Sequence, residues 1–295
     1  MAEVSVYIPA YNAAGFLERS IEALLAQTHA PDEILVIDDG SGDSTAEITG
    51  RYPQVKLIRH AENRGLAAAR NTAFQAARNE LVASIDADCV PAPYWLATLL
   101  PHMENPKLAG VGGRLVEGVL DSVADRWRSA HMPQEWGPEP IYNPMFLFGA
   151  NNLFRKSAVL DAGGYDESMR TNGEDADLCR RLRSSGCDLA YDPTAKVTHL
   201  RHDTARSVLD TYWRWLFFGR PEAAKGVKLH LILRHAFLGN VRYMLYGLLK
   251  SDLKARRFEL IGLDFLTLFY FPYRELKVWL HSRSRSKRPA DPGVG

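Results

Sequence analysis

Residues 33–41 read Glu33-Ile34-Leu35-Val36-Ile37-Asp38-Asp39-Gly40-Ser41, an apolar run that ends in two acids and a turn. An uninterrupted apolar run of this length indicates a strand buried on both faces, and the Asp, Gly and Ser residues are typical of the turn that follows. Strands buried in this way occur in parallel sheets that helices cover on both sides. The stretch therefore predicts an α/β fold with polar side chains where the strand ends.

The segments around this stretch repeat the same order of strand and helix. Further strands are expected at Val4–Pro9, Val55–Ile58 and Leu81–Ile85, and helices at 17–25 and 66–77. Strands that alternate with helices form right-handed βαβ units in a mainly parallel sheet. Ligands of such sheets lie beyond the carboxyl ends of the strands, where this sequence places residues 9–12, 38–39 and 86–88.

The pattern changes along the rest of the chain. Two more strands are expected near 109–115 and 196–200, and residues 127–144, which are rich in Pro, Trp and Tyr, are expected to form a functional loop. Long helical patterns follow at 205–219, 229–250 and 254–282. The sequence thus predicts an α/β domain over 1–203, a helical region over 204–285 and a disordered tail over 286–295.

The composition excludes several classes of protein. The 295 residues are 46% hydrophobic and 24% charged, with 36 Lys/Arg and 35 Asp/Glu. A net charge of +1 excludes a strongly basic nucleic-acid binder and a highly charged disordered chain, so no nucleic-acid partner is expected. Three scattered cysteines favour a reducing compartment. Without a signal sequence or an apolar run of about 18 residues, we expect a cytoplasmic protein that does not cross a bilayer.

The triplet Asp86-Ala87-Asp88 follows a predicted strand, so both carboxylates would lie at the ligand-binding edge of the sheet. Two acids in this place suit Mg²⁺ or Mn²⁺, which prefer oxygen ligands. His199, at the end of a later strand, could complete the metal site, and His202 lies nearby. The alternatives are a turn that caps a helix starting near Pro91, and a histidine with a structural role.

A nucleotide site is predicted beside this triplet. Asp39 could accept a hydrogen bond from a base N–H while Tyr11 flanks the base, although an Asx-turn into a helix at Ser44 explains the acids equally well. Arg64 and Arg70 could each contact a diphosphate, or simply lie on the surface. The chain has no Gly-x-Gly-x-x-Gly after its first strand, which argues against a dinucleotide site.

Glu174 and Asp175 follow Gly173 at the predicted start of a helix. A carboxylate there could act as the general base that takes a proton from an acceptor hydroxyl. Acids at a helix start also cap it and favour the helix dipole, and the residues themselves do not decide between the two roles.

These clusters occur in the order seen in a known family. The chain resembles the family 2 glycosyltransferases over about residues 3–203, and the resemblance implies the nucleotide-sugar-binding α/β fold called GT-A. It depends on seven motifs in register: Val4–Asn12, Glu33–Asp43, Asn63–Asn71, Asp86–Asp88, Phe148–Asn152, Gly163–Glu167 and Gly173–Asp175.

The resemblance implies a role for each matching residue. Pro9, Tyr11, Asn12 and Asp39 would hold the nucleotide, Arg64 and Arg70 would face the diphosphate, Asp86 would approach the ribose or sugar, and Asn151 and Asn152 would shape the donor and acceptor pocket. Asp88 would coordinate Mn²⁺ or Mg²⁺ with His199 as a further ligand. Asp175 would be the general base, and Glu174 would position substrate. Many members carry another acid after the triplet, where this chain has Cys89.

The implied reaction is inverting transfer of one sugar from a nucleotide diphosphate sugar, with UDP-sugars favoured, to a hydroxyl of a lipid-linked or cell-surface glycan. Processive members carry Gln-x-x-Arg-Trp, whereas this chain has only Tyr212-Trp213-Arg214-Trp215, which favours single transfer. The alternatives are a sugar nucleotidyltransferase, for which Ala13-Ala14-Gly15 is a poor phosphate loop, and a non-catalytic sugar-nucleotide-binding protein.

The C-terminal region is basic. Residues 229–288 hold 12 Lys/Arg against 4 Asp/Glu, and aromatic residues lie among the cations. Over 229–282 this pattern predicts peripheral contact with the inner face of the cell membrane. The alternative is that the same helices pack on the catalytic domain or on a second copy in a homo-oligomer.

Overall fold

The computed structural model describes residues 2–169, 172–218 and 239–286, and its contacts divide the chain into two compact units. The sheet unit comprises residues 1–119 and 133–201, and the helical unit comprises residues 120–132 together with the chain from 202 onward. Residues 120–132 thus belong to the helical unit although they lie within the range 1–203. The residues 229–238 and 287–295, for which a helix and a tail are predicted, lie outside the described residues.

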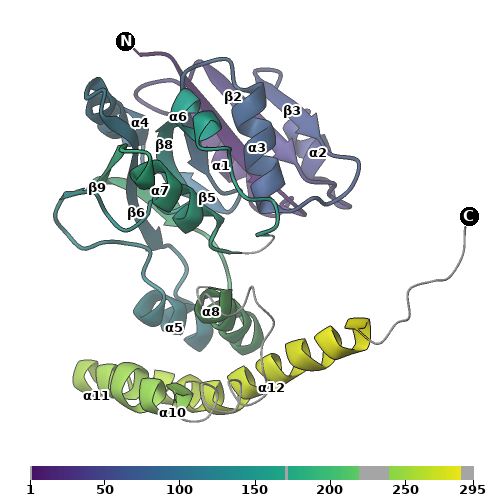
Figure 1. The fold of residues 1–295 in the computed structure, drawn as a ribbon, viewed down its shortest axis with the longest axis vertical. Coiled ribbons are helices and arrows are strands. Elements are labelled where there is room, and N and C mark those ends of the chain that lie inside the picture. Colours follow the sequence, from purple (N-terminus) through teal and green to yellow (C-terminus); the bar gives the residue numbers. More distant parts are fainter. Residues whose placement is uncertain (1, 170–171, 219–238, 287–295) are drawn as a thin grey trace, which may run out of the picture. The chain divides into compact units, whose positions relative to one another are not determined.

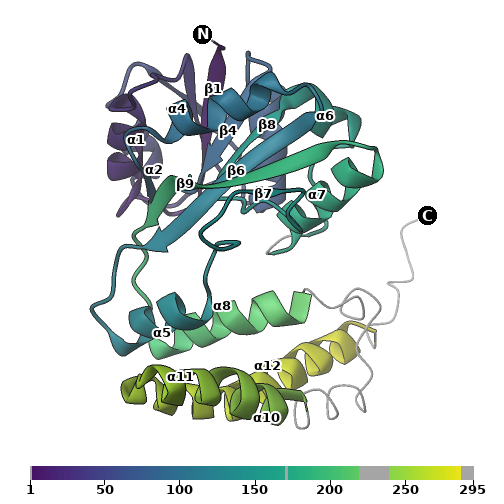
Figure 2. The ribbon, with the colours of Figure 1, turned by 90° about the vertical axis from the view of Figure 1, so that its left-hand side faces the viewer.

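The sheet unit is built on a single sheet with the strand order β3-β2-β1-β4-β8-β6-β9-β5, and β7 pairs with β9 (Figures 1 and 2). Its strands are β1 (Val4–Ala10), β2 (Glu33–Asp38), β3 (Val55–Arg59), β4 (Leu81–Ile85), β5 (Cys89–Pro91), β6 (Leu108–Glu117), β7 (Ile141–Tyr142), β8 (Asn151–Arg155) and β9 (Asp188–His199). Strands β3, β2, β1 and β4 are parallel, and β8 runs antiparallel between β4 and β6. This is the predicted mainly parallel α/β sheet.

Helices cover both faces of this sheet. They are α1 (Leu17–Leu25), α2 (Thr45–Thr49), α3 (Leu66–Ala76), α4 (Trp95–Leu99), the 3₁₀-helix η1 (Leu100–Glu104), α6 (Lys156–Asp161) and α7 (Glu174–Ser184). Alternate residues of β1 point to opposite faces, so Val4, Val6 and Ile8 pack with α1 and α4, whereas Tyr7 packs with α3 and α7. Burial on both faces explains why the strands are uninterrupted apolar runs.

Two local expectations are wrong. Residues 127–131 belong not to a loop but to helix α5 (Val123–His131), which begins with a capping box in which Ser122 and Asp125 bond each other's backbone. The second is the helix expected near Pro91. Residues 89–91 form β5 instead, because they pair with β9, and the helix α4 starts at Trp95. The acids of the triplet therefore do not cap a helix.

The helical unit contains α5, α8 (Ala205–Phe218), α10 (Asn240–Tyr243), the π-helical η4 (Met244–Leu249), α11 (Lys250–Ala255), the 3₁₀-helix η5 (Phe258–Leu260) and α12 (Ile261–Ser286). Its core packs Trp127 of α5 against Tyr212 of α8, with ring centroids 5.0 Å apart, and Leu263 and Phe271 of α12 join them. Among the residues that the structure describes, no helix combines the length and the apolar character that crossing a bilayer requires.

A buried polar cluster lies inside this core. His131 Nε2 is 2.9 Å from Asp252 Oδ2 and 3.8 Å from Asp264 Oδ1, and Trp127 Nε1–H donates to Asp264 Oδ1 at 2.8 Å. Burial raises the pKa of the Asp264 carboxyl to about 6, since the hydrogen bond from Trp127 offsets only part of the desolvation and the Asp252 carboxylate adds repulsion. Burial also lowers the pKa of His131.

Asp264→Asn is therefore expected to stabilise the protein more at pH 8 than at pH 4.5. A folded pKa above the usual 3.8 means that the stability contributed by Asp264 is complete below 3.8 and is lost as the pH rises through about 6. Asparagine keeps the acceptor for Trp127 and does not titrate, so its advantage should grow by about 1–3 kcal/mol over this range. Thermal unfolding of the Asp264→Asn variant and of the unchanged chain at several pH values measures this difference in stability. Asp161→Asn is the control. A difference that does not change with pH would contradict the prediction.

Candidate active site

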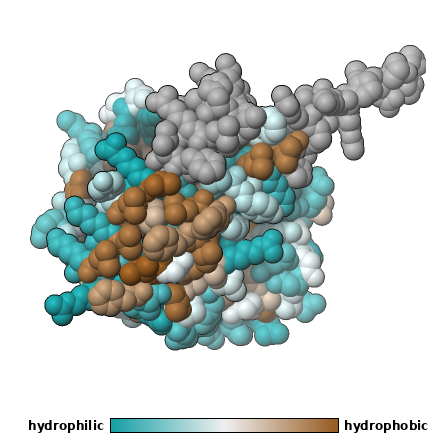
Figure 3. All heavy atoms as spheres, turned by 90° about the horizontal axis from the view of Figure 1, so that it is seen from below, coloured by the Kyte–Doolittle hydropathy of each residue, from teal (hydrophilic) through white to brown (hydrophobic). Residues whose placement is uncertain are grey.

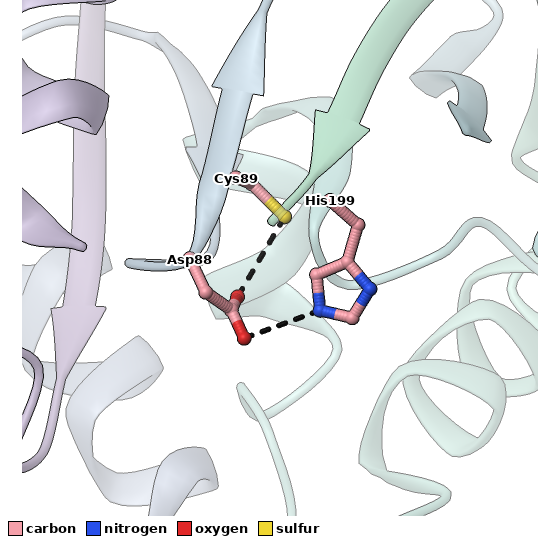
Figure 4. A group of neighbouring side chains, drawn as sticks. All are labelled: Asp88, Cys89 and His199. Carbon is pink, nitrogen blue, oxygen red and sulfur yellow. Dashed lines mark hydrogen bonds and ion pairs between the residues drawn. The ribbon is translucent and has the colours of Figure 1, made fainter. Parts of the chain in front are cut away.

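The carboxyl ends of β1, β2 and β4 and the ends of β6 and β9 meet at one edge of the sheet. Asp88 follows β4, and His199 is the last residue of β9; their Oδ2 and Nε2 atoms are 3.1 Å apart (Figure 4). The other ring nitrogen, Nδ1, lies 3.0 Å from Glu117 Oε2 at the end of β6. Strand pairing causes this meeting, because Glu117 and His199 face each other in the register of β6 and β9.

The electrostatics of this pair match a cation site. Burial alone would lower the pKa of His199, but hydrogen bonds to Asp88 and Glu117 outweigh it and raise that pKa to about 9. Burial likewise works against ionisation of Asp88, yet the hydrogen bond with His199 keeps its pKa below the ordinary value. His199 is thus an imidazolium that stabilises the charge of Asp88. A divalent ion would replace the imidazolium proton, and the carboxylate with the neutral imidazole is then a donor set that Mn²⁺ accepts.

Cys89 lies beside Asp88, with its Sγ 3.8 Å from Asp88 Oδ1, and these two residues with His199 bring their potential ligand atoms within 4.8 Å of one another. Burial and the carboxylates of Asp88 and Asp86 hold the pKa of Cys89 well above its ordinary value. Its sulfur is therefore a neutral thiol, which suits hydrogen-bond donation to Asp88 better than metal ligation.

Arg70 connects the triplet to the acids of α7. Its guanidinium is buried, and its Nη2 lies 3.4 Å from Asp86 Oδ1 and 3.8 Å from Glu174 Oε1. Glycine at position 149 leaves room for this group, because a Cβ there would lie 2.3 Å from Arg70 Nη1 and the guanidinium would have to shift. The structure thus places Arg70 inside the protein, between two carboxylates, rather than on the surface.

Glu174 and Asp175 differ in environment although they are neighbours. Glu174 is buried, and burial raises its pKa to about 7, with Arg70 opposing and the Asp175 carboxylate adding to the rise. Asp175 is partly exposed, and its Oδ2 accepts a hydrogen bond of 3.2 Å from the backbone N–H of Gly149. Of the two acids, Asp175 is therefore the one that is open to solvent.

Asp39 is buried after β2 and holds the following loop in place. Its carboxylate accepts the backbone N–H groups of Arg64 at 2.9 Å and Gly65 at 2.8 Å, and its Oδ1 lies 2.7 Å from His60 Nδ1. Arg64 itself is exposed, with its Nη2 3.3 Å from Glu167 Oε2. The contact of Asp39 with a base N–H stays a prediction. The Asp39 carboxylate would accept that hydrogen bond in addition to the three described here.

The remaining predicted residues lie in different surroundings. Tyr11 and Asn12 are exposed after β1, whose Pro9 is buried. Asn151 is fully buried: its Oδ1 accepts from Trp95 Nε1, and its Nδ2 donates to the carbonyls of Arg114 and Ala195. Asn152 Nδ2 donates to two carbonyls, and its buried Oδ1 has no partner among the described residues.

Residues 5–165, more than half of the chain, match the model of the family described as "Glycosyl transferase family 2". The chain belongs to glycosyltransferase family 2. The resemblance inferred from the sequence is thereby confirmed.

Named relatives are 28–33% identical to this chain over the aligned residues. The "Pre-mycofactocin glycosyltransferase" of Mycobacterium tuberculosis is 33% identical over an alignment of 236 residues that covers 77% of this chain and 48% of that protein. The "Glucosyl-dolichyl phosphate glucuronosyltransferase" of Haloferax volcanii is 28% identical, over 67% of this chain and 69% of that protein. The chain spans about half the length of the M. tuberculosis relative.

Solved structures confirm the GT-A fold. The mannosyltransferase PcManGT from Pyrobaculum calidifontis, in complex with GDP-Man and Mn²⁺, superposes with a TM-score of 0.62 at 18% identity, covering 92% of this chain and 87% of that one. GalNAc-T7 with UDP, GalNAc and Mn²⁺ gives a TM-score of 0.54 at 21% identity, covering 72% of this chain and 47% of that one.

The sequence analysis assigned no role to several residues that contact the predicted site residues. Glu117 bonds His199, His60 bonds Asp39, and the ring of Tyr165 lies 5.6 Å from Arg70 Cζ. Tyr165 belongs to a motif quoted for the family, but Glu117 and His60 are isolated residues whose partners are far away in sequence. His202 does not share their surroundings: it belongs to the helical unit, where its Nδ1 is 3.8 Å from Asp125 Oδ2.

Proposed function

We propose that this family 2 chain is an inverting, metal-dependent glycosyltransferase. It moves a single sugar from a nucleotide diphosphate sugar, with UDP-sugars favoured, to a hydroxyl of a lipid-linked or cell-surface glycan. The observation that carries the proposal is that the triplet Asp86–Asp88 holds both the ion pair of Asp88 with His199 and the carboxylate of Asp86, whose partner Arg70 also contacts Glu174. It supports a donor site and a base site at one edge of the sheet.

On the acceptor side, Asp175 is the proposed base. Its partly exposed carboxylate takes the proton of the acceptor hydroxyl as that oxygen bonds to the anomeric carbon and the bond from this carbon to the diphosphate oxygen breaks. One displacement of this kind inverts the anomeric configuration. Glu174, with its raised pKa and its contact to Arg70, orients the neighbouring groups instead of taking the proton.

On the donor side, Asp88 and His199 are the proposed metal ligands. A bound Mn²⁺ or Mg²⁺ would neutralise the charge that develops on the leaving diphosphate. Cys89, as a neutral thiol, helps to orient Asp88, and Arg70 holds Asp86 in place. Tyr11 and Asn12 are exposed beside this edge and available to a nucleotide, and Arg64, also exposed, is available to its phosphates.

The acceptor is the least defined partner. A lipid-linked sugar is supported by the dolichyl phosphate named for the Haloferax volcanii relative, and a cell-surface glycan by the "Poly-beta-1,6-N-acetyl-D-glucosamine synthase" of Staphylococcus aureus, which is 29% identical over 72% of this chain and 53% of that protein. The three cysteines are free thiols, which suits a reaction on the cytoplasmic side of the membrane.

A donor screen tests this proposal. Purified protein is incubated with UDP- and GDP-sugars and Mn²⁺ or Mg²⁺, and the released nucleoside diphosphate is measured with and without chelator. We expect slow hydrolysis of one donor that stops when the metal is removed. If no donor turns over, calorimetry with UDP and GDP decides: binding that requires metal supports the donor site and calls for added acceptors, whereas no binding of either nucleotide overturns the proposal.

A further inference from the structure

Helix α12 in the helical unit buries several polar side chains and exposes several large apolar ones. Asp264, Thr267 and Glu275 are buried on the side that faces the core of the unit. Between residues 261 and 280, most of the exposed side chains are apolar: 44–73% of each of Phe265, Phe269 and Tyr273 is exposed, and Leu266, Leu276 and Leu280 continue the stripe, with Lys277 as an exposed cation. A helix on the surface of a water-soluble protein normally has the opposite arrangement.

The neighbouring helices extend this apolar surface. Leu245 and Tyr246 of η4 and Leu253 of α11 are exposed, with 71% of Tyr246 open to solvent. Figure 3, which views the molecule from the side of α10 to α12, shows the apolar side chains gathered into one patch with hydrophilic side chains along its edges. We call the exposed apolar residues of η4, α11 and α12 the outer face.

In the same segment, most acidic side chains are buried and many basic side chains are exposed. Of the four acids between residues 239 and 280, Asp252, Asp264 and Glu275 are buried, and only Glu259 is exposed, where Arg126 Nε lies 3.9 Å from it. The cations Arg242, Lys250, Lys254 and Arg256 are all exposed. The outward-facing charge of this part of the described chain is thus almost entirely positive.

We propose that the outer face docks on a bilayer that contains anionic lipids. Phe and Leu side chains enter the acyl boundary, Tyr side chains lie at the headgroups, and the Lys and Arg residues contact lipid phosphates. Since none of the described helices is long and apolar enough to span a bilayer, the contact is peripheral.

The charge pattern favours a membrane over a second copy of the chain. A two-fold interface brings the same patch of both copies together, which would set like charges against one another across the outer face. Such an arrangement costs free energy unless acids are interleaved, and the exposed acid of this segment, Glu259, is already paired with Arg126. An anionic surface satisfies both the apolar and the cationic residues.

Sedimentation of the full chain with sucrose-loaded vesicles tests the proposal. One set of vesicles is phosphatidylcholine alone, and the other contains about one third phosphatidylglycerol. We expect the protein to sediment with the anionic vesicles and to remain largely in solution with the neutral ones. Binding should weaken as salt rises, because the headgroup contacts are screened.

Two double variants separate the contributions of the apolar and the cationic side chains to vesicle binding. Phe265→Ser with Phe269→Ser should weaken binding by about tenfold for each phenylalanine. Leu160→Ser, which changes an apolar residue of α6 about as exposed as Phe265, should leave binding unchanged. Lys250→Gln with Lys254→Gln should weaken binding by about fivefold per lysine. The matched control for these is Lys56→Gln with Lys107→Gln, which removes two exposed cations from the sheet unit.

The outcomes distinguish this proposal from the proposed reaction, because vesicle binding needs neither donor nor acceptor. A full chain that stays in solution with anionic vesicles overturns the docking proposal whatever the donor screen gives. So does equal binding by the phenylalanine variants and the unchanged chain, or a dimer in light scattering that the phenylalanine variants abolish. Unfolding temperatures of all variants confirm that changes at these exposed positions leave the fold intact.

Discussion

Asp175→Asn is expected to lower the rate of sugar transfer by about 10²–10⁴-fold, the range typical of a lost general base. Asparagine is isosteric and can still accept the backbone N–H of Gly149, so the start of α7 should remain folded. The amide cannot take the proton of the acceptor hydroxyl. Transfer rates with the donor and acceptor found in the screens measure the effect, and donor binding, followed by calorimetry, should stay within about twofold of the unchanged chain.

Asp177→Asn is the matched control for this change. Asp177 lies on the same helix, two residues further on, and its carboxylate pairs with Arg180 and Arg181. Its replacement should cost some stability and leave the transfer rate nearly unchanged. Equal losses in the two variants would show that the helix, and not the carboxylate of Asp175, accounts for the effect. An Asp175→Asn protein with full activity would remove Asp175 from the mechanism.

Asp88→Asn should be the second most damaging substitution, with a loss of about 10²-fold or more in the metal-dependent rate. Asparagine keeps the shape of the side chain and an oxygen that can accept from His199. It removes the negative charge, so the site would hold a divalent cation less tightly and stabilise the leaving diphosphate less. The concentration of Mn²⁺ that gives half of the maximal rate should rise together with the loss of rate.

The control for Asp88→Asn is Asp161→Asn, which removes an exposed carboxylate at the end of α6. Titration of each protein with Mn²⁺, followed through the quenching of tryptophan fluorescence, reports metal binding without turnover. If Asp88→Asn binds Mn²⁺ as tightly as the control, then Asp88 is not a ligand, whatever happens to the rate.

The fold could be predicted where structure is local. Strands β1 to β4 are short, largely apolar runs separated by helical patterns, and β1, β2 and β4 are buried by helices on both faces, so their sequence alone indicates them. Strand β8 escaped prediction because it begins with Asn151 and Asn152 and owes its conformation to pairing with β4 and β6. Helix α5 could have been found from Ser122 and Asp125, whose spacing is that of a capping box.

The site shows a similar division. The order of motifs indicated which residues meet at the sheet edge, since the carboxyl ends of parallel strands share that edge. It also placed His199 with Asp88, 111 residues earlier in the chain, but it could not show that Glu117 joins them. Nor could it place Arg70, because an arginine in an alanine-rich helix has no feature that distinguishes a buried side chain from an exposed one.

That buried guanidinium has a consequence for how substitutions at this site combine. Arg70 is the common counter-ion of Asp86, which we propose lies on the donor side, and Glu174, which we propose lies on the acceptor side. When either carboxylate is removed, Arg70 interacts with the remaining one alone. The free energy of each carboxylate's interaction with Arg70 therefore depends on whether the other is present. The effects of single substitutions at the two positions will therefore not add. A single residue, Arg70, thus couples the free energies of the two carboxylates.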